Sequence, residues 1–272
     1  MRAEEGTRRS RTTSRERNMS TTANLTGQGA FITGGSKGIG AASAIALAKA
    51  GCDVVVTYHS DEAGARQVVS EVAKLGRKAK ALPCDVCKTV QVERAVDEAV
   101  EFLGRLDIVF ANAGGLIRRC PLTDMDEELF QAVFDLNVTS LFRTVKAAVP
   151  HLRRSGGGSI ILMSSVAARN GATAGAVAYA AAKGAAMTLA RGLSKELAPF
   201  KIRVNAVAPG VIQTAFHAET PKEILDSLSR TITVGRLGVA EDVARAVVFL
   251  AGERDGFITG ETIDINGGMW LA

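Results

Sequence analysis

The chain has 272 residues, of which 47% are hydrophobic and 22% are charged. These proportions are typical of a folded globular protein and exclude a disordered or fibrous one. No uncharged apolar run reaches the roughly 18 residues that a membrane-spanning helix needs, and the N-terminus lacks the apolar core of a signal peptide. We therefore expect a cytoplasmic protein with no membrane partner.

The formal net charge of +5 is unevenly distributed along the chain. Residues 1–18 contain six arginines and three glutamates but almost no apolar side chains. Such a segment cannot offset its ordering entropy, so we expect residues 1–24 to form a flexible basic tail, with Met19 as an alternative start. The remaining body is close to neutral, which gives no reason to predict a nucleic-acid partner.

Four cysteines and three histidines are present, without the spacing of a metal site. Cys84 and Cys87 form a C-x-x-C pattern, but no second pair completes a four-thiolate zinc site. The histidines are scattered along the chain. We therefore expect reduced thiols and no bound metal.

From residue 28 onward, short β-branched runs alternate with Ala-rich helical stretches. Taken in chain order, we predict strand 31–33, helix 41–50, strand 54–58, a helix ending at 75, strand 80–82, helix 90–103, strand 106–111, helix 127–153, strand 159–163, helix 179–197, strand 202–207, a helix near 243–251 and strand 262–265. The almost continuously apolar strand 106–111 is typical of a parallel sheet covered on both faces. The order predicts an α/β fold with a doubly wound parallel sheet and ligands at the carboxyl ends of its strands.

A glycine-rich turn connects the first predicted strand to the first helix. It has the pattern G-x-x-x-G-x-G, and its residues are candidates for binding a dinucleotide: Gly34, Ser36, Lys37, Gly38, Ile39 and Gly40. Glycine permits a tight turn and a close approach of the backbone. The N-terminus of the following helix attracts phosphate through its free N–H groups and its dipole.

The same turn also fits G-x-S-x-G, the nucleophile pattern of α/β-hydrolases, with Ser36 as the nucleophile. This alternative needs a later acid and a histidine, for which His217 is the main candidate. It lacks the oxyanion loop of such enzymes, and the motif lies on the first strand. We keep it as an alternative of a different class.

Tyr179 and Lys183 are four residues apart on a predicted helix, so their side chains lie on one face. A nearby ammonium favours phenolate and lowers the pKa of a tyrosine into the range useful for acid/base catalysis. The pair is therefore a candidate proton-transfer site.

Taken together, the glycine turn, Asn112-Ala113-Gly114, Asn137, Ser165, Tyr179-to-Lys183, Pro209-Gly210 and the ending Asn266-Gly267-Gly268 resemble the short-chain dehydrogenase/reductase family. The ending resembles its 3-oxoacyl-[acyl-carrier-protein] reductase and sugar dehydrogenase branch. The resemblance covers residues 25–272 and implies one Rossmann-type domain of about seven strands. It also implies an NAD(P)-dependent oxidoreductase that interconverts a carbonyl and a secondary alcohol.

The resemblance implies a role for each matching residue. Tyr179 is the expected general acid/base, and Lys183 is expected to lower its pKa and bind the nicotinamide ribose. Ser165 is expected to hold the substrate oxygen, with Ser164 as a substitute, and Asn137 to pin a water in the proton path. Further cofactor contacts are expected from Asp85, Val86, Asn112, Ala113, Gly114, Pro209, Gly210, Val211 and Thr214.

Two positions depart from the family pattern. The Ser165–Tyr179 spacing is one residue longer than usual, so we expect the intervening loop to bulge. Ala111 stands where the family commonly has a first Asn.

The end of the second strand bears on the choice of cofactor. An acidic side chain there would accept from the ribose hydroxyls and repel a 2′-phosphate. Tyr58, His59 and Ser60 stand there instead, and Lys37 can meet the phosphate, although Asp61 follows closely. We predict a preference for NADP(H), with NAD(H) possible.

The substrate candidates lie in loops at the carboxyl end of the sheet. They are Gly115, Ser165, Arg169, Phe216 and His217, and Arg118 and Arg119 add to a possible cationic rim. Such a rim suits a keto-sugar, a keto-acid or a 3-oxoacyl thioester, although simply solvated arginines are an equal alternative. A non-catalytic dinucleotide-binding regulator remains a third class. The Ala- and Gly-rich Tyr179 helix and the family resemblance predict a homotetramer.

Overall fold

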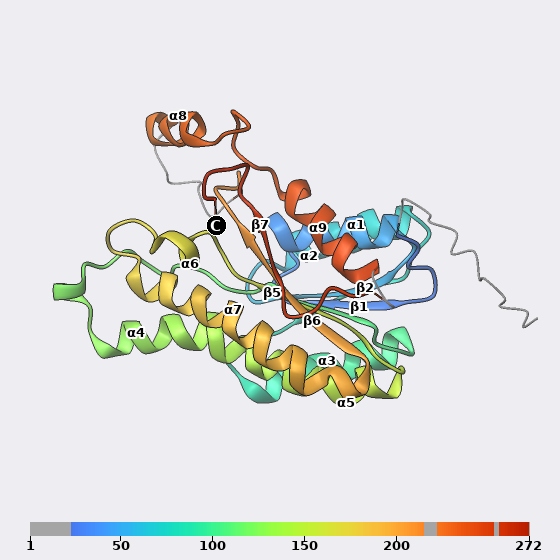
Figure 1. Ribbon diagram of the computed structural model, residues 1–272. Helices are drawn as coiled ribbons and strands as arrows, with labels where there is room; N and C mark the ends of the chain where they lie inside the picture. Colours follow the sequence, from blue (N-terminus) through green and yellow to red (C-terminus); the bar gives the residue numbers. More distant parts are fainter. Residues whose placement is uncertain (1–22, 215–221, 253–255, 272) are drawn as a thin grey trace, which may run out of the picture.

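The computed structural model in Figure 1 describes residues 23–214, 222–252 and 256–271. Most of the predicted tail, and Phe216 and His217 among the substrate candidates, lie outside these residues. Within them, seven parallel strands form one sheet in the order β3-β2-β1-β4-β5-β6-β7. The strands are β1 (Gly29–Ile32), β2 (Asp53–Tyr58), β3 (Ala79–Pro83), β4 (Ile108–Ala111), β5 (Gly158–Met163), β6 (Ile202–Pro209) and β7 (Thr262–Ile265). The predicted doubly wound Rossmann-type sheet is confirmed.

Helices cover both faces of the sheet (Figure 1). One face carries α1 (Gly38–Lys49), α2 (Glu62–Lys74) and α9 (Ala240–Gly252), and the other carries α3 (Thr89–Leu103), α4 (Glu127–Phe134), α5 (Ser140–Arg154) and α7 (Val177–Leu197). The short α6 (Ala167–Asn170) follows β5, and α8 (Lys222–Thr231) follows β6. Among the described helices, none is both long and apolar enough to cross a membrane.

The strands are buried on both faces because each face packs against a helical layer. Phe31, Val109 and Ile160 belong to the core under α3, α5 and α7. Their neighbours Ile32 and Phe110 belong to the core under α1 and α9. Burying each such side chain contributes roughly 1.5–3 kcal/mol. These two cores hold the strand ends, and therefore the loops that follow them, in fixed positions.

The helix predicted over residues 127–153 is wrong in one respect, because it is interrupted. A π-helical turn at Asp135–Thr139 separates α4 from α5. The Asn137 side chain donates from Nδ2 to the carbonyl oxygen of Val133 at 2.9 Å within this turn. Buried positions keep helical spacing through the turn, at Val133, Asn137 and Leu141, so the sequence pattern reads as one helix. Such π turns are frequent at functional sites.

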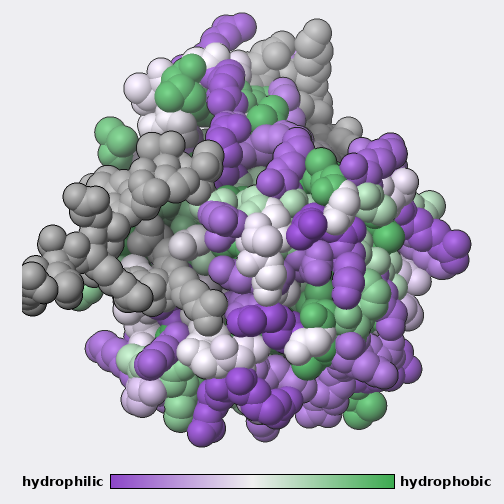
Figure 2. Space-filling view, turned by 90° about the vertical axis from the view of Figure 1, so that its right-hand side faces the viewer, coloured by the Kyte–Doolittle hydropathy of each residue, from purple (hydrophilic) through white to green (hydrophobic). Residues whose placement is uncertain are grey.

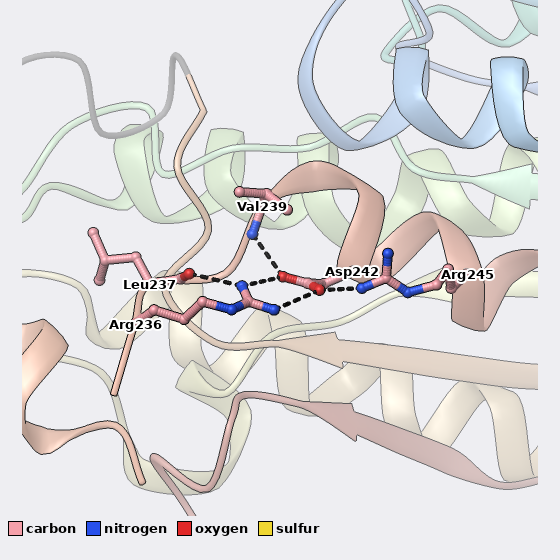
Figure 3. Close-up of polar contacts among 5 residues, drawn as sticks. All are labelled: Arg236, Leu237, Val239, Asp242 and Arg245. Atoms are coloured by element: carbon pink, nitrogen blue, oxygen red, sulfur yellow. Dashed lines mark hydrogen bonds and ion pairs between the residues drawn. The ribbon is translucent and has the colours of Figure 1, made fainter. Parts of the chain in front are cut away.

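The chain between α8 and α9 is fastened at several points. Gly238 donates its N–H to the carbonyl of Val211 at 3.0 Å, which ties this segment to the chain after β6. Figure 3 shows that Asp242 accepts hydrogen bonds from Arg236, Arg245 and the backbone of Val239. These contacts hold the pKa of Asp242 far below its usual range, chiefly through Arg236. The carboxylate thus anchors the start of α9 to the end of the segment between α8 and α9.

The side of the molecule shown in Figure 2 is the right-hand side of Figure 1. Where it is not covered by grey residues, hydrophilic residues dominate and hydrophobic ones are scattered among them. Scattered apolar residues are normal for a solvated surface.

Candidate active site

A cavity of about 1020 Å³ lies at the carboxyl ends of the strands. Every residue predicted to bind the dinucleotide lines it: Gly34, Ser36, Lys37, Gly38, Ile39, Gly40, Tyr58, His59, Ser60, Asp85, Val86, Asn112, Ala113, Gly114, Tyr179, Lys183, Pro209, Gly210, Val211 and Thr214. These residues lie at or after the ends of β1, β2, β3, β4 and β6, at the start of α1, and in the first two turns of α7. The fold therefore brings the predicted set together in one place.

The glycine turn is shaped for a close approach to a ligand. A Cβ on Gly40 would lie 2.3 Å from the carbonyl oxygen of Gly34, so no larger residue fits. Gly38 opens α1 with a φ of 56°, in the left-handed region that favours glycine. The first N–H groups of α1 have no partner within the helix. The turn thus fits the diphosphate of a dinucleotide, which binds at such helix N-termini.

Asn112 joins the ends of β1 and β4. Its Nδ2 donates to the carbonyl oxygens of Thr33 at 2.9 Å and Gly34 at 3.0 Å. The Thr33 hydroxyl in turn accepts the N–H of Asn112 at 3.0 Å and that of Ala113 at 3.0 Å. These bonds hold both loops against one another, and Thr33 is a positioning residue that the sequence reasoning did not single out.

Ser165 and Tyr179, the predicted catalytic pair, both line the cavity. Ser165 follows β5, Tyr179 lies in the first turn of α7, and their side chains are hydrogen-bonded. Ser164 is used differently, because its hydroxyl donates to the carbonyl of Lys183 at 2.8 Å inside the core. The structure therefore favours Ser165 over Ser164 as the residue that faces a substrate.

Lys183 is 2% exposed and lies behind Tyr179. Its Nζ donates to the carbonyl of Met163 at 3.1 Å and lies 5.5 Å from the centroid of the Tyr179 ring. Burial lowers the pKa of Lys183 to about 8. The pKa of Tyr179 is raised by burial, and the hydrogen bond with Ser165 lowers it only in part. Burial and the Ser165 hydrogen bond are the causes that act on the pKa of Tyr179 in this geometry, so the lowering by Lys183 stays a prediction.

Asn137 is fully buried and braces the loop after β4. Its Oδ1 accepts the N–H of Gly115 at 3.0 Å, and its Nδ2 donates to the carbonyl of Gly115 at 2.8 Å. A Cβ on Gly114 would lie 2.7 Å from Asn137 Oδ1 and 3.1 Å from Lys183 Nζ, so this glycine permits the two side chains to approach the loop. The side chain thus fixes loop geometry beside Lys183.

Two substrate candidates are placed away from the cavity. Arg169 does not line it, because both its Nε and its Nη2 donate to the Asp264 carboxylate, at 3.3 and 3.0 Å. Gly115 is not a lining residue either, although its neighbours Gly114 and Leu116 are, and its backbone is hydrogen-bonded to Asn137. In this structure Arg169 therefore ties α6 to β7, and its predicted contact with the substrate finds no support here. The longer Ser165–Tyr179 segment contains α6 and the loop after it.

The sequence reasoning missed much of the substrate wall. The cavity is also lined by Leu116, Ile117, Leu136, Val166, Thr173, Ile212, Leu228 and Met269. No local pattern marks these residues, because they come from separate loops, from α8 and from the C-terminal turn. Arg119, named as part of a possible rim, does line the cavity. No cluster of three or more potential metal ligands occurs among the described residues.

Comparison with known proteins decides the family. A family model described as enoyl-(acyl carrier protein) reductase matches residues 34–270. An uncharacterised oxidoreductase of Methylorubrum extorquens is 41% identical over 248 residues, which cover 90% of this chain and 98% of the relative. The chain belongs to the short-chain dehydrogenase/reductase family. This membership sets aside the hydrolase with Ser36 as nucleophile, and makes the protein an NAD(P)-dependent oxidoreductase of carbonyl and alcohol groups.

Solved structures of this family share the fold closely. A 7α-hydroxysteroid dehydrogenase complexed with NADH and 7-oxo glycochenodeoxycholic acid has a TM-score of 0.86 and 35% identity, covering 91% of this chain and 96% of its own. A carveol dehydrogenase of Mycobacterium avium in complex with NAD has a TM-score of 0.86 and 32% identity, covering 91% and 99%. Both hold a nicotinamide dinucleotide, in agreement with the glycine-lined cavity here.

Proposed function

We propose that this protein interconverts a ketone and a secondary alcohol with Tyr179 as the general acid/base, within one domain formed by residues 25–272. The observation that carries the proposal is the hydrogen-bonded Ser165–Tyr179 pair, backed by the buried Lys183, at the end of the glycine-lined cavity. A bound nicotinamide dinucleotide supplies or accepts the hydride. The protein has to hold the carbonyl oxygen and move one proton to or from it.

Each side chain has a distinct task in this mechanism. Ser165 donates to the substrate oxygen, where negative charge develops during reduction. Tyr179 gives its phenolic proton to that oxygen, or takes it back during oxidation. Lys183 places a cation beside the phenolate that forms and binds the nicotinamide ribose. Asn137 keeps the Gly115 backbone beside Lys183 and takes part in the water path that returns the proton.

We propose NADP(H) as the preferred cofactor. The Asp61 carboxylate accepts the N–H of Gly64 at 3.0 Å as the cap of α2. This acidic group also lines the cavity, but it caps α2, and the end of β2 itself presents Tyr58, His59 and Ser60. Exposed Lys37 adds a cation on the same cavity wall. These features favour a 2′-phosphate over a free ribose hydroxyl.

The proposed substrate is a keto-acid, a keto-sugar or a 3-oxoacyl thioester. Arg169 does not support an acidic substrate, because its guanidinium is paired with Asp264. Arg119 remains on the cavity wall, and Arg118 lies 3.9 Å from the Asp126 carboxylate. A panel of ketones, keto-acids and sugar alcohols, assayed with both nicotinamides, distinguishes these classes. A protein that binds a nicotinamide dinucleotide but turns over no member of the panel would instead be a regulator.

Replacing Tyr179 by Phe tests the proposal. We expect kcat to fall by at least about 100-fold, because general acid/base catalysis contributes roughly 10²–10⁴-fold. Binding of the reduced cofactor, followed by its fluorescence, should stay within about threefold, since only one hydroxyl is removed. Ser164→Ala serves as the matched control for Ser165→Ala, which should lose most of its activity. Full hydride transfer in the Phe variant would exclude Tyr179 as the proton carrier.

A further inference from the structure

The wall of the cavity beside Tyr179 is built from two loops that cross. The N–H of Cys120 donates to the carbonyl oxygen of Gly175 at 2.9 Å, so residues 119–120 lie against residues 173–175. The second loop leads directly into α7, where Tyr179 is the third residue. Residues on this crossing therefore stand next to the first turn of α7, which carries Tyr179.

Arg119 projects from this crossing with its guanidinium held in place. Its Nη1 donates to the Thr173 hydroxyl at 2.6 Å and to the carbonyl of Ala174 at 3.3 Å. Both partners are neutral, so the positive charge of Arg119 is not compensated by them. Within the described residues, its Nε and Nη2 make no further hydrogen bond or ion pair. Two donors of a fixed guanidinium are the geometry that binds a carboxylate.

The other charged residues that line the cavity have different positions. Lys37, Asp61 and Asp85 lie at the glycine turn and after β2 and β3, around the dinucleotide site. Asp135 is paired with Arg143 at 2.8 Å. Lys183 is buried behind Tyr179. Arg119 is therefore an exposed cation on the cavity wall that makes no ion pair with an acid among the residues that the structure describes.

The surface beside Arg119 is apolar. Ile117 lines the cavity with 52% of its surface exposed, and it has a φ of 65°. This conformation is a genuine outlier for a β-branched residue, and such strain concentrates at ligand sites. Leu116, Leu228 and Met269 add further apolar surface. An apolar ligand body would cover side chains that are otherwise in contact with water.

We propose that Arg119 determines substrate specificity, and that the substrate is a ketone with an apolar body and one carboxylate that binds this guanidinium. The proposal rests on the oxidoreductase function proposed above and names the substrate class of that site. Arg119 selects the substrate and takes no part in proton or hydride transfer.

The test uses oxooctanoates with the ketone at positions 3 to 7, each paired with its methyl ester, and the full-length enzyme with NADPH. For at least one isomer we expect kcat/KM of the acid to exceed that of the ester by about tenfold or more, as for a hydrogen bond to a charged group. In Arg119→Met this ratio should fall to about one while the ester is affected less than about threefold. The ratio should also fall with added salt in the wild type, because an exposed pair is screened.

Arg118→Met is the matched control, since it removes a neighbouring exposed arginine and should leave the acid-to-ester ratio unchanged. An equal loss for acid and ester in Arg119→Met would overturn the proposal, because it would indicate a purely structural role in the wall. The absence of a preference for the acid at every chain position in the wild type would overturn it as well.

Binding separates this proposal from the oxidoreductase function. Octanoate binding to the enzyme saturated with NADP⁺, measured by calorimetry, should weaken about tenfold or more in Arg119→Met. If octanoate binds in this manner but no ketone is turned over, Arg119 is a carboxylate-binding residue, but the oxidoreductase proposal fails and the assignment of a ketone substrate fails with it. If ketones are turned over but octanoate binding does not depend on Arg119, the oxidoreductase proposal holds and the proposal for Arg119 fails.

Discussion

Lys183 places an ammonium in the interior of the protein, where burial lowers its pKa from 10.5 to about 8. Between about pH 8 and pH 10.5 the unfolded chain therefore binds more protons at this residue than the folded chain. The free energy of unfolding gains a contribution that rises with pH over this window and is constant below it. The size of this contribution is on the order of 3 kcal/mol at most.

Denaturant titrations of wild type and Lys183→Met between pH 7 and pH 10 measure this contribution. We expect Lys183→Met to be more stable than the wild type at pH 7. This difference in the free energy of unfolding should shrink as the pH rises. The two proteins have to be compared because burial also raises the pKa values of Cys84 and Cys87 to about 11. These thiols lower the stability of both proteins above pH 9, so their effect cancels in the comparison. A difference that is independent of pH would show that Lys183 titrates normally.

Lys37 is the residue on which the proposed preference for NADP(H) depends. It precedes α1 and is exposed on the cavity wall. In Lys37→Met we expect kcat/KM with NADPH to fall by about fivefold to tenfold, because one charge-assisted contact to the 2′-phosphate is lost. Activity with NADH should change little. Lys49→Met, in the last turn of the same helix, is the control, and comparable wild-type efficiency with NADH and NADPH would refute the preference.

At the scale of elements, the pair Arg169–Asp264 connects α6 to the last strand. The two side chains are 22% and 24% exposed, so solvent screens this pair less than a surface pair. Because α6 begins two residues after Ser165, the pair positions the loop that carries the hydroxyl proposed to face the substrate. We therefore expect Arg169 to position the loop around Ser165 through its pair with Asp264, without contacting the substrate itself.

Replacing Arg169 by Met should loosen this wall. We expect KM for the ketone to rise by about tenfold, as for a lost charged hydrogen-bond pair, with the Kd for the cofactor unchanged. The reversed pair, Arg169→Asp with Asp264→Arg, should recover part of the loss. Arg66→Met is the control, because its ion pair with Glu62 has side chains 77% and 52% exposed and should matter little. An unchanged KM in Arg169→Met would rule out the positioning role.

At the scale of the whole molecule, α7 presents a smooth outward face. A Cβ added at Gly184 or Gly192 would meet no described atom within 4 Å. Helix α5 lies in the same layer as α7 (Figure 1), and its residue Phe142 is 52% exposed. Small residues permit close helix packing, and an exposed aromatic residue gains by being buried. This layer is therefore the surface through which we expect the predicted homotetramer to assemble.

Sedimentation equilibrium tests the assembly. We expect a species of four times the chain mass of 28.4 kDa. Gly192→Arg should shift it to smaller species, because a long cation would separate the packed helices. Ala73→Arg, on α2 at the opposite layer, should leave the mass unchanged. A wild-type protein that sediments at the monomer mass would contradict the prediction.

The sequence by itself determined the sheet, the dinucleotide-binding cavity and the family. The information is carried by short local patterns, such as the glycine turn before α1 and the four-residue spacing of Tyr179 and Lys183. Such patterns can be read from the sequence because residues close together along the chain define the backbone geometry there. The π turn at Asp135–Thr139 could not be predicted, because the buried positions before, within and after it keep the spacing of a continuous helix.

Only the tertiary structure decided how the arginines are used. Arg169 and Arg119 look alike in the sequence, but Asp264 lies 95 residues from the first, and Thr173 lies 54 residues from the second. The same holds for the apolar wall, which Ile117, Leu228 and Met269 form from three distant segments. Partners so far apart along the chain meet only because the packed sheet brings its loops to one edge, and no local pattern encodes that meeting.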